Sequence, residues 1–338
     1  MPIHLIQQAV QHLMAGHLVA LPTETVYGLG ADAANAEAVA KIFAAKGRPA
    51  DHPLIVHLAD ASHIGQWALE IPQGAKDLAA AFWPGPLTLI LKKQPWVPLA
   101  VTGGQDTVGL RVPAHPLALA LLAAFSAARS PKAAGIAAPS ANLFGRVSPT
   151  TAAHVREELG DKVSLVLDGG ACEVGIESTI VDFSRPQLEI LRPGAISPED
   201  IARVIGVLPR LRGKTAGKHT DAIPRVSGSL EAHYAPLTPL RREAPNKLIA
   251  ELARQAHAGR RVAVLAHGRY AASDTCLAHH WHTAPQEPAA YARQLYANLR
   301  MLDALGAELI LVEEVPLSIG WQAIADRLAR AAAGSGAA

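Results

Sequence analysis

The chain has 338 residues, a formal net charge of +2 and two cysteines. This length allows one large or two medium domains with apolar cores of their own. The charge is too small to indicate nucleic-acid binding by itself, and no uninterrupted run of eighteen apolar residues predicts a membrane span. Cys172 and Cys276 do not make a disulfide framework, and no secretory signal is recognisable, so we expect a reducing, cytoplasmic location.

The first segment of interest runs from residue 18 to residue 58. Residues 18–21 form an apolar tetrad that is typical of a buried strand, and a Pro/Gly turn with two hydroxyls, a carboxylate and a phenol follows it. A helix is predicted from about residue 37 to 45, ending at Gly47. Residues 54–58 then form a second strand.

Two cations, Lys46 and Arg48, lie on the loop that ends this helix. Beside a hydroxyl-rich turn they could form an anion site, and the alternative is an ordinary solvated loop. The residues of this segment alone leave both interpretations open.

Polar residues recur where later strands end. Arg111 stands inside an apolar strand at 107–113 and needs an anionic partner, either an Asp or Glu of the chain or a ligand. The strand at 136–138 runs into a polar loop, and residues 148–150 are expected to cap the next helix. Further strands are predicted at 165–167, 179–182 and 190–192. Such strand ends are typical of a ligand cleft at the edge of an α/β sheet.

The hydrophobic periodicity disappears between residues 208 and 236, which predicts a linker or a functional lid. Beyond it, helices are predicted at 246–258, 289–305 and 320–331 and strands at 261–266 and 308–313. This alternation indicates a small parallel α/β domain.

Two other signals are weak. Cys276, His279, His280 and His282 are metal-ligand residue types, but their spacing matches no structural zinc pattern, so we expect a histidine-rich surface loop. No Gly-x-Ser-x-Gly elbow is present, so there is no evident hydrolase nucleophile.

The motifs taken together resemble one family, the threonylcarbamoyl-AMP synthases in their long two-domain form. The motifs that carry the resemblance are Pro22-Thr23-Glu24-Thr25-Val26-Tyr27-Gly28-Leu29, Lys46-Gly47-Arg48-Pro49, Pro53-Leu54-Ile55-Val56-His57, Trp83-Pro84-Gly85-Pro86-Leu87-Thr88, Arg111-Val112-Pro113, Pro139-Ser140-Ala141-Asn142, Ser178-Thr179-Ile180-Val181-Asp182, Leu191-Arg192-Pro193-Gly194 and the linker motif Ser227 to Pro236. Glu24 stands where the family commonly has an aspartate.

The resemblance implies the fold and the domain boundaries. We expect an α/β protein: a YrdC-like twisted open α/β sheet domain at residues 1–207, a linker or lid at 208–237, and a small Rossmann-like parallel α/β domain at 238–333.

The resemblance also implies the reaction. The family joins L-threonine, bicarbonate and ATP, with Mg²⁺, to give threonylcarbamoyl-AMP, pyrophosphate and water, for threonylcarbamoyladenosine modification of tRNA next to the anticodon. No protein nucleophile is required. A downstream tRNA threonylcarbamoyl transferase complex is the expected partner, and weak tRNA binding is compatible with this activity.

Site residues carry over by motif. Those expected to bind threonine are Thr25, His57, Arg111, Ser140 and Ser178. Those expected to bind ATP are Lys46, Arg48, His52, Thr107, Asn142, Ser148, Arg192 and Ser227. Tyr234 is expected to belong to a lid that excludes water, and no side chain is expected to ligate a metal.

Two alternatives to this interpretation remain. A hydrogenase-maturation carbamoyltransferase would carry Cys-x-x-Cys pairs, which two distant cysteines cannot supply. A non-catalytic double-stranded RNA- or tRNA-binding protein would be expected to carry aromatic platforms, whereas aromatic residues are 4% of this chain. The sequence does not determine the oligomeric state, the role of the C-terminal domain or the preference for threonine over serine.

Overall fold

The computed structural model describes residues 3–129, 133–212 and 223–336, which fold as two compact units. The first unit comprises Met1–Phe144, Pro149–Glu173 and Glu177–Ser229, and the second comprises Gly145–Ser148, Val174–Ile176 and Leu230–Ala338. Two short segments that lie between stretches of the first unit in the sequence therefore belong to the second unit. Part of the predicted linker, residues 213–222, lies outside the described residues.

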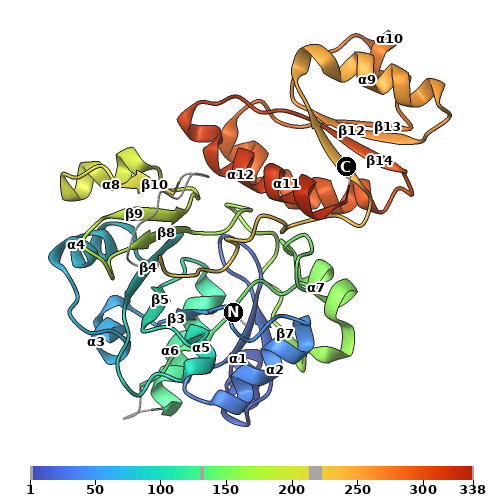
Figure 1. Cartoon of the computed structure of the whole chain (residues 1–338). Helices are drawn as coiled ribbons and strands as arrows, with labels where there is room; N and C mark the ends of the chain where they lie inside the picture. Colours follow the sequence, from blue (N-terminus) through green and yellow to red (C-terminus); the bar gives the residue numbers. More distant parts are fainter. Residues whose placement is uncertain (1–2, 130–132, 213–222, 337–338) are drawn as a thin grey trace. The chain divides into compact units, whose positions relative to one another are not determined.

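The first unit is built on a mixed sheet, which within the described residues has ten strands in the order β10-β9-β8-β4-β5-β3-β6-β2-β1-β7 (Figure 1). The strands are β1 Val19–Leu21, β2 Gly28–Asp32, β3 Ile55–His57, β4 Leu87–Lys92, β5 Thr107–Arg111, β6 Ile136–Ala137, β7 Leu165–Val166, β8 Thr179–Asp182, β9 Glu189–Arg192 and β10 Arg210–Leu211. The predicted strands of this half are confirmed. β10 falls inside the predicted linker and pairs in parallel with β9.

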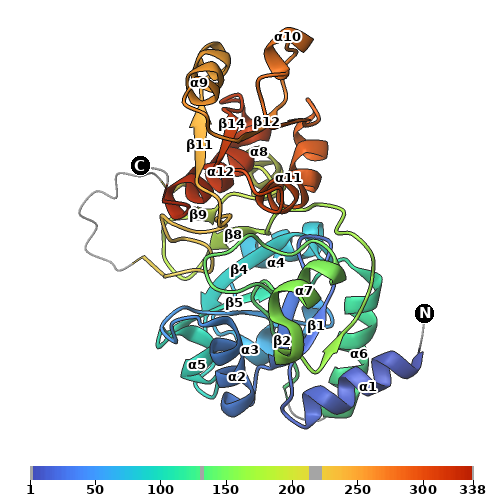
Figure 2. The same ribbon diagram turned by 90° about the vertical axis from the view of Figure 1, so that its right-hand side faces the viewer.

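Helices cover the sheet on both faces. They are α1 Ile3–Met14, α2 Ala36–Lys46, α3 Ile64–Trp67, α4 Gln73–Phe82, α5 Leu99–Thr102, α6 Pro116–Arg129, α7 Ala152–Leu159 and α8 Pro198–Ile205. The larger apolar cluster joins α2, α4, α7 and α8 to one face of the strands. The helices α1 and α6 lie side by side and bury Val19, Leu21 and Ile136 from the opposite face (Figure 2).

The end of α2 follows the sequence prediction closely. Asn35 caps its N-terminus by accepting hydrogen bonds from the backbone N–H groups of Glu37 and Ala38. Gly47 ends the helix in the left-handed region, with φ +62°, which favours glycine.

The position predicted for the N-terminal cap of α7 was wrong, because it lies one to three residues too early. Its cap is Thr151, whose hydroxyl accepts from His154 N, and not a residue of 148–150.

The second unit is a small α/β unit with a parallel sheet, as predicted. Its described strands β11 Leu240–Glu243, β12 Val262–Ala266, β13 His280–Thr283 and β14 Leu309–Glu313 are arranged in the order β11-β14-β12-β13, with every neighbouring pair parallel. The helices are α9 Pro245–His257, α10 Ala272–Thr275, α11 Pro288–Asp303 and α12 Gln322–Gly334.

Two strands of the second unit were not predicted. β13 was expected to be part of a histidine-rich surface loop, and it is instead an edge strand. Its residues are half-buried or exposed, so they lack the apolar run from which the inner strands β12 and β14 were recognised. β11 carries Arg241 and Arg242 and lacks that run for the same reason.

Gly194 provides a test of packing at the end of β9. A Cβ at this position would lie 2.4 Å from Thr179 N and 2.7 Å from Ser178 C, and backbone atoms cannot move away cheaply. We expect Gly194→Ala to lower the free energy of unfolding by about 2 kcal/mol in urea denaturation. The matched control is Gly65→Ala in α3, where a Cβ meets no atom within 4 Å. Equal stabilities of the two variants would contradict this packing.

Candidate functional site

One face of the first unit's sheet carries a row of polar side chains. Successive residues of a strand point to opposite faces, so residues two apart share a face. The apolar positions Ile55, Ile90 and Ile180 pack together on this face. The residues two positions away from these isoleucines are His57 on β3, Thr88 on β4 and Ser178 directly before β8. The register pairs His57 with Arg111 and Thr88 with Ile180. The sheet therefore brings four separate motifs into one row.

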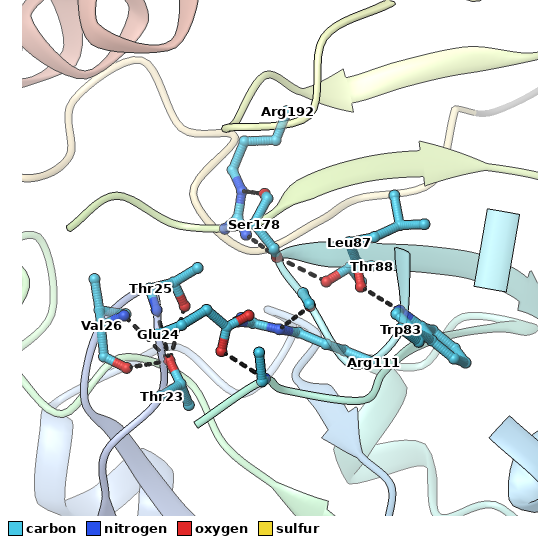
Figure 3. Close-up of polar contacts among 12 residues, drawn as sticks. Thr23, Glu24, Thr25, Val26, Trp83, Leu87, Thr88, Arg111, Ser178 and Arg192 are labelled. Carbon is cyan, nitrogen blue, oxygen red and sulfur yellow. Dashed lines mark hydrogen bonds and ion pairs between the residues drawn. The ribbon is translucent and has the colours of Figure 1, made fainter. Parts of the chain in front are cut away.

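Arg111 forms a buried ion pair with Glu24. Its Nη2 donates to Glu24 Oε1 at 2.6 Å, and the two side chains are 5% and 7% exposed. The second oxygen of Glu24 accepts from Ala114 N, and Arg111 Nε donates to Gly85 O (Figure 3). The sequence left open whether a chain carboxylate would pair with Arg111, and Glu24 does so. Arg111 Nη1 has no hydrogen bond among the residues that the structure describes, so it can still bind an anionic group.

His57 lies beside Arg111 and is buried. Burial, and then the Arg111 charge, lower the pKa of His57 to about 3, so the imidazole is neutral at neutral pH. Its Nδ1 is buried without a hydrogen-bond partner in the described part of the chain. Buried polar atoms usually have a partner. The structure therefore leaves the hydrogen-bonding capacity of this imidazole incompletely used.

Thr25 lies in the turn before β2, where it is fully buried. Its hydroxyl and that of Thr23 are 2.8 Å apart, and Thr23 Oγ1 also donates to Val26 O. These bonds fix the turn that carries Glu24, so the turn presents its carboxylate to Arg111 (Figure 3).

A hydrogen-bonded chain connects β4, β8 and β9. The hydroxyls of Thr88 and Ser178 are 2.8 Å apart, and Arg192 Nη2 donates to Ser178 Oγ at 3.0 Å. Arg192 also donates from Nε to Ser178 O and from Nη1 to Ser227 O. The predicted residues Ser178, Arg192 and Ser227 are thus in direct contact (Figure 3 shows the first two).

Lys46 is buried at the C-terminal end of α2. Its Nζ donates to the carbonyl oxygens of Ser140 and Asn142, so this lysine connects two predicted site residues. Burial, and then the Arg48 charge, lower the pKa of the Lys46 ammonium well below its usual range. An anion beside Lys46 would offset both effects and favour the charged form.

Arg48 contacts the linker directly. Its Nη2 donates to Ser227 Oγ at 3.1 Å and to Pro53 O at 3.0 Å, and its guanidinium lies over the ring of Phe144. His52 packs edge-on against the same ring, and burial, followed by the Arg48 charge, lowers the pKa of His52. The two arginines predicted to bind phosphate, Arg48 and Arg192, therefore both contact Ser227.

Beside Ser227 lies a pocket over the apolar part of the same sheet face. It is lined by the site residues Thr107 and Ser227, by Arg225, and by the apolar residues Ile55, Ile90 and Val226 among others. Thr107 is half-buried at the start of β5.

The second unit holds two of the predicted residues. Ser148 is buried there. Tyr234 has φ +61°, is 1% exposed and packs against His233, Tyr296 and the guanidinium of Arg327. The structure thus places Tyr234 in the interior of the second unit, and its expected function in a lid stays a prediction.

Sequence reasoning assigned no role to Glu24 or Thr88. Both stand inside motifs that carry the family resemblance, next to residues with an expected role. The signal for Glu24 was available: a buried arginine needs a carboxylate, and Glu24 belongs to a turn at a strand end. Cys172 lies near this ion pair, and burial raises the pKa of its thiol to about 12, so it is not a reactive thiolate.

The part of the chain that the structure describes contains no group of three or more His, Cys, Asp or Glu side chains arranged to hold a metal ion. Over the same residues, no helix combines the length and the apolar character that crossing a membrane requires.

Comparison with known proteins decides the family. A family model described as "Telomere recombination" matches residues 11–194, and one described as "Threonylcarbamoyl-AMP synthase, C-terminal domain" matches residues 196–333. The chain belongs to the threonylcarbamoyl-AMP synthase family. The predicted family, fold class and enzyme function are thereby confirmed.

Similar proteins match almost end to end. Threonylcarbamoyl-AMP synthase of Pyrococcus abyssi is 40% identical over 332 residues, covering 96% of this chain and 93% of the relative. That of Bacillus subtilis is 40% identical over 338 residues, covering 97% and 93%. The crystal structure of P. abyssi Sua5 complexed with L-threonine has a TM-score of 0.87 at 39% identity, covering 98% of this chain and 94% of that one.

The buried His57 predicts a pH dependence of stability. The pKa is about 3 in the folded chain against 6.5 ordinarily, so only the unfolded chain gains a proton just below pH 6.5. The folded state therefore loses up to about 1.4 kcal/mol per pH unit as the pH falls. Between pH 6.5 and 5, we expect the free energy of unfolding to fall by about 2 kcal/mol less in His57→Gln than in the unmodified chain. Urea denaturation at each pH measures this difference. An unchanged slope would contradict a neutral, buried His57.

Proposed function

We propose that the polar face of the first unit is the place where this chain joins L-threonine, bicarbonate and ATP into threonylcarbamoyl-AMP, pyrophosphate and water. The observation that carries the proposal is the convergence of Arg48 and Arg192, which come from distant segments, on Ser227. Arginine pairs with fixed geometry are well suited to phosphate groups. The neighbouring row of His57, Arg111 and Ser178 suits a small zwitterion.

L-Threonine brings a carboxylate, an amine and a hydroxyl. We assign its carboxylate to Arg111, because Nη1 remains available while Nε and Nη2 hold the guanidinium in place. Ser178 supplies a hydroxyl to the same group. The neutral Nδ1 of His57 can accept a hydrogen bond from the amine or the hydroxyl. Thr25 and Ser140 complete the threonine side of the proposal.

ATP is assigned to the opposite end of the row. Its phosphates would contact Lys46, Arg48 and Arg192, and its nucleoside would lie near Thr107 and Ser227. Asn142, His52 and Ser148 are further ATP-side residues of the proposal. Mg²⁺ would bridge phosphate oxygens as part of the nucleotide complex and neutralise charge on the departing pyrophosphate.

The chemistry requires no nucleophile of the protein. A carbamate, formed from the threonine amine and bicarbonate with loss of water, attacks the α-phosphorus of ATP and displaces pyrophosphate. The site therefore contributes alignment of the reactants and cationic stabilisation of the adenylyl group being transferred and of the leaving pyrophosphate. The carbamate and the acyl adenylate are both labile in water. A linker that covers the cleft, with Tyr234 contributing to the lid, would protect them.

The product would pass to a tRNA threonylcarbamoyl transferase complex, and we propose a cytoplasmic location for this activity. Weak tRNA binding by the chain would assist this transfer.

The direct test is turnover by the purified protein. With ATP, Mg²⁺, bicarbonate and L-threonine we expect pyrophosphate release together with an adenylate of the mass of threonylcarbamoyl-AMP. Omission of bicarbonate or threonine, or removal of Mg²⁺ with EDTA, should abolish both signals. Folded protein that releases no pyrophosphate with any amino acid, but binds tRNA in a salt-sensitive way, would contradict the proposal.

A second test addresses Arg192. Its three nitrogens donate to Ser178 O, Ser178 Oγ and Ser227 O, and a lysine has one nitrogen in their place. We expect Arg192→Lys to lower kcat/KM for ATP at least about tenfold in the pyrophosphate assay. The matched control is Arg203→Lys, an exposed arginine of α8 that is paired with Asp200. A kcat/KM within twofold of the unmodified enzyme would exclude a phosphate-binding role.

A further inference from the structure

Residues 223–229 lie on the polar face of the first unit. Ile223 and Val226 pack against the isoleucines of β3, β4 and β8. Apolar contact of this kind is non-directional, so it does not by itself determine where the segment lies along the strands. Its position depends on two separate sets of hydrogen bonds.

The first set is centred on Ser227. The hydroxyl accepts from Arg48 Nη2 at 3.1 Å and donates to Pro53 O at 2.9 Å, and the carbonyl accepts from Arg192 Nη1 at 2.9 Å. Both guanidinium groups are proposed phosphate ligands. This set of contacts is therefore shared with the nucleotide, and it can weaken when the phosphates bind.

The second set is centred on Gln105 and Arg225. Gln105 Oε1 accepts from the backbone N–H of Arg225 at 2.6 Å, and Gln105 Nε2 donates to the carbonyl of Arg225 at 3.1 Å. The side chain of Arg225 donates to Gly103 O at 2.7 Å and to Asp51 O at 3.3 Å. One amide side chain thus binds both backbone groups of one linker residue, as a neighbouring strand would. No proposed phosphate ligand takes part.

We propose that Gln105 is a positioning residue for ATP. It clamps the backbone of Arg225 and so keeps Ser227 beside Arg48 and Arg192 while these arginines bind the phosphates. Gln105 also lines the pocket beside Ser227, and neither of its bonds to Arg225 involves a proposed phosphate ligand. This inference rests on the proposed function, because it assigns the ATP phosphates to those two arginines.

The test combines backbone exchange with kinetics on Gln105→Ala. We expect amide hydrogen exchange in the peptide covering 223–229 to be about fivefold faster or more, since both bonds to Arg225 are lost. We expect KM for ATP to rise about fivefold, while KM for threonine and the melting temperature stay close to those of the unmodified enzyme. A positioning role for ATP raises KM for ATP alone. A merely structural defect would also change KM for threonine or the melting temperature.

The matched control is Gln94→Ala. Gln94 Nε2 donates to the backbone carbonyls of Gly65 and Ala68, so this variant removes similar bonds from the same unit without touching the linker. Gln105→Glu retains an acceptor for Arg225 N–H and loses the donor, and it should give intermediate exchange. Arg225→Ala should also accelerate exchange, because its two side-chain bonds are lost.

Hydrogen exchange tests the clamp and enzyme kinetics test the proposed function, so failure of one can be told from failure of the other. Exchange in 223–229 at the same rate in Gln105→Ala and Gln94→Ala would overturn the clamp, whether or not the enzyme turns over. Faster exchange with an unchanged KM for ATP would also overturn the positioning role. Unmodified protein that forms no adenylate would refute the proposed function, and the exchange arm would still decide the clamp.

Discussion

A guanidinium group removed from water must donate its N–H groups to acceptors, or the folded state loses several kcal/mol. The first unit depends on this constraint at two buried arginines. Arg111 joins β5 to the turn that follows β1 through Glu24, and Arg192 joins β9 to β8 through Ser178. These bonds join the turn and the strand ends that carry the polar row. The residues that stabilise this turn and these strand ends are therefore the same ones that can bind an anion.

The same arginines stabilise the fold and can bind an anion, and this explains the arrangement of the site. Alternate residues of each strand point to the same face of the sheet, and this face carries both the isoleucines and the polar row. The isoleucines give the linker an apolar surface to pack on, and the polar row supplies hydrogen-bond partners. Burial lowers the pKa values of His57 and Lys46, and the His57 imidazole is therefore neutral at neutral pH.

The second unit follows a simpler rule. Its parallel sheet has an apolar interior in β12 and β14, and amphipathic helices connect the strands. Each inner strand is a continuous apolar run, and this is why the sequence predicted both correctly. The edge strands β11 and β13 escaped prediction because their polar residues carry no such run.

The sequence by itself determined the family, the fold class and most strands and helix ends, because these depend on local features: apolar runs, a glycine at a helix end, and motifs in a fixed order. Only the tertiary structure decided that Glu24 pairs with Arg111, that Thr88 joins Ser178, and that Gln105 holds Arg225. These contacts connect segments that lie far apart in the chain. They arise from strand register and from the need of buried polar groups for hydrogen-bond partners. Neither can be predicted from a single segment of the sequence.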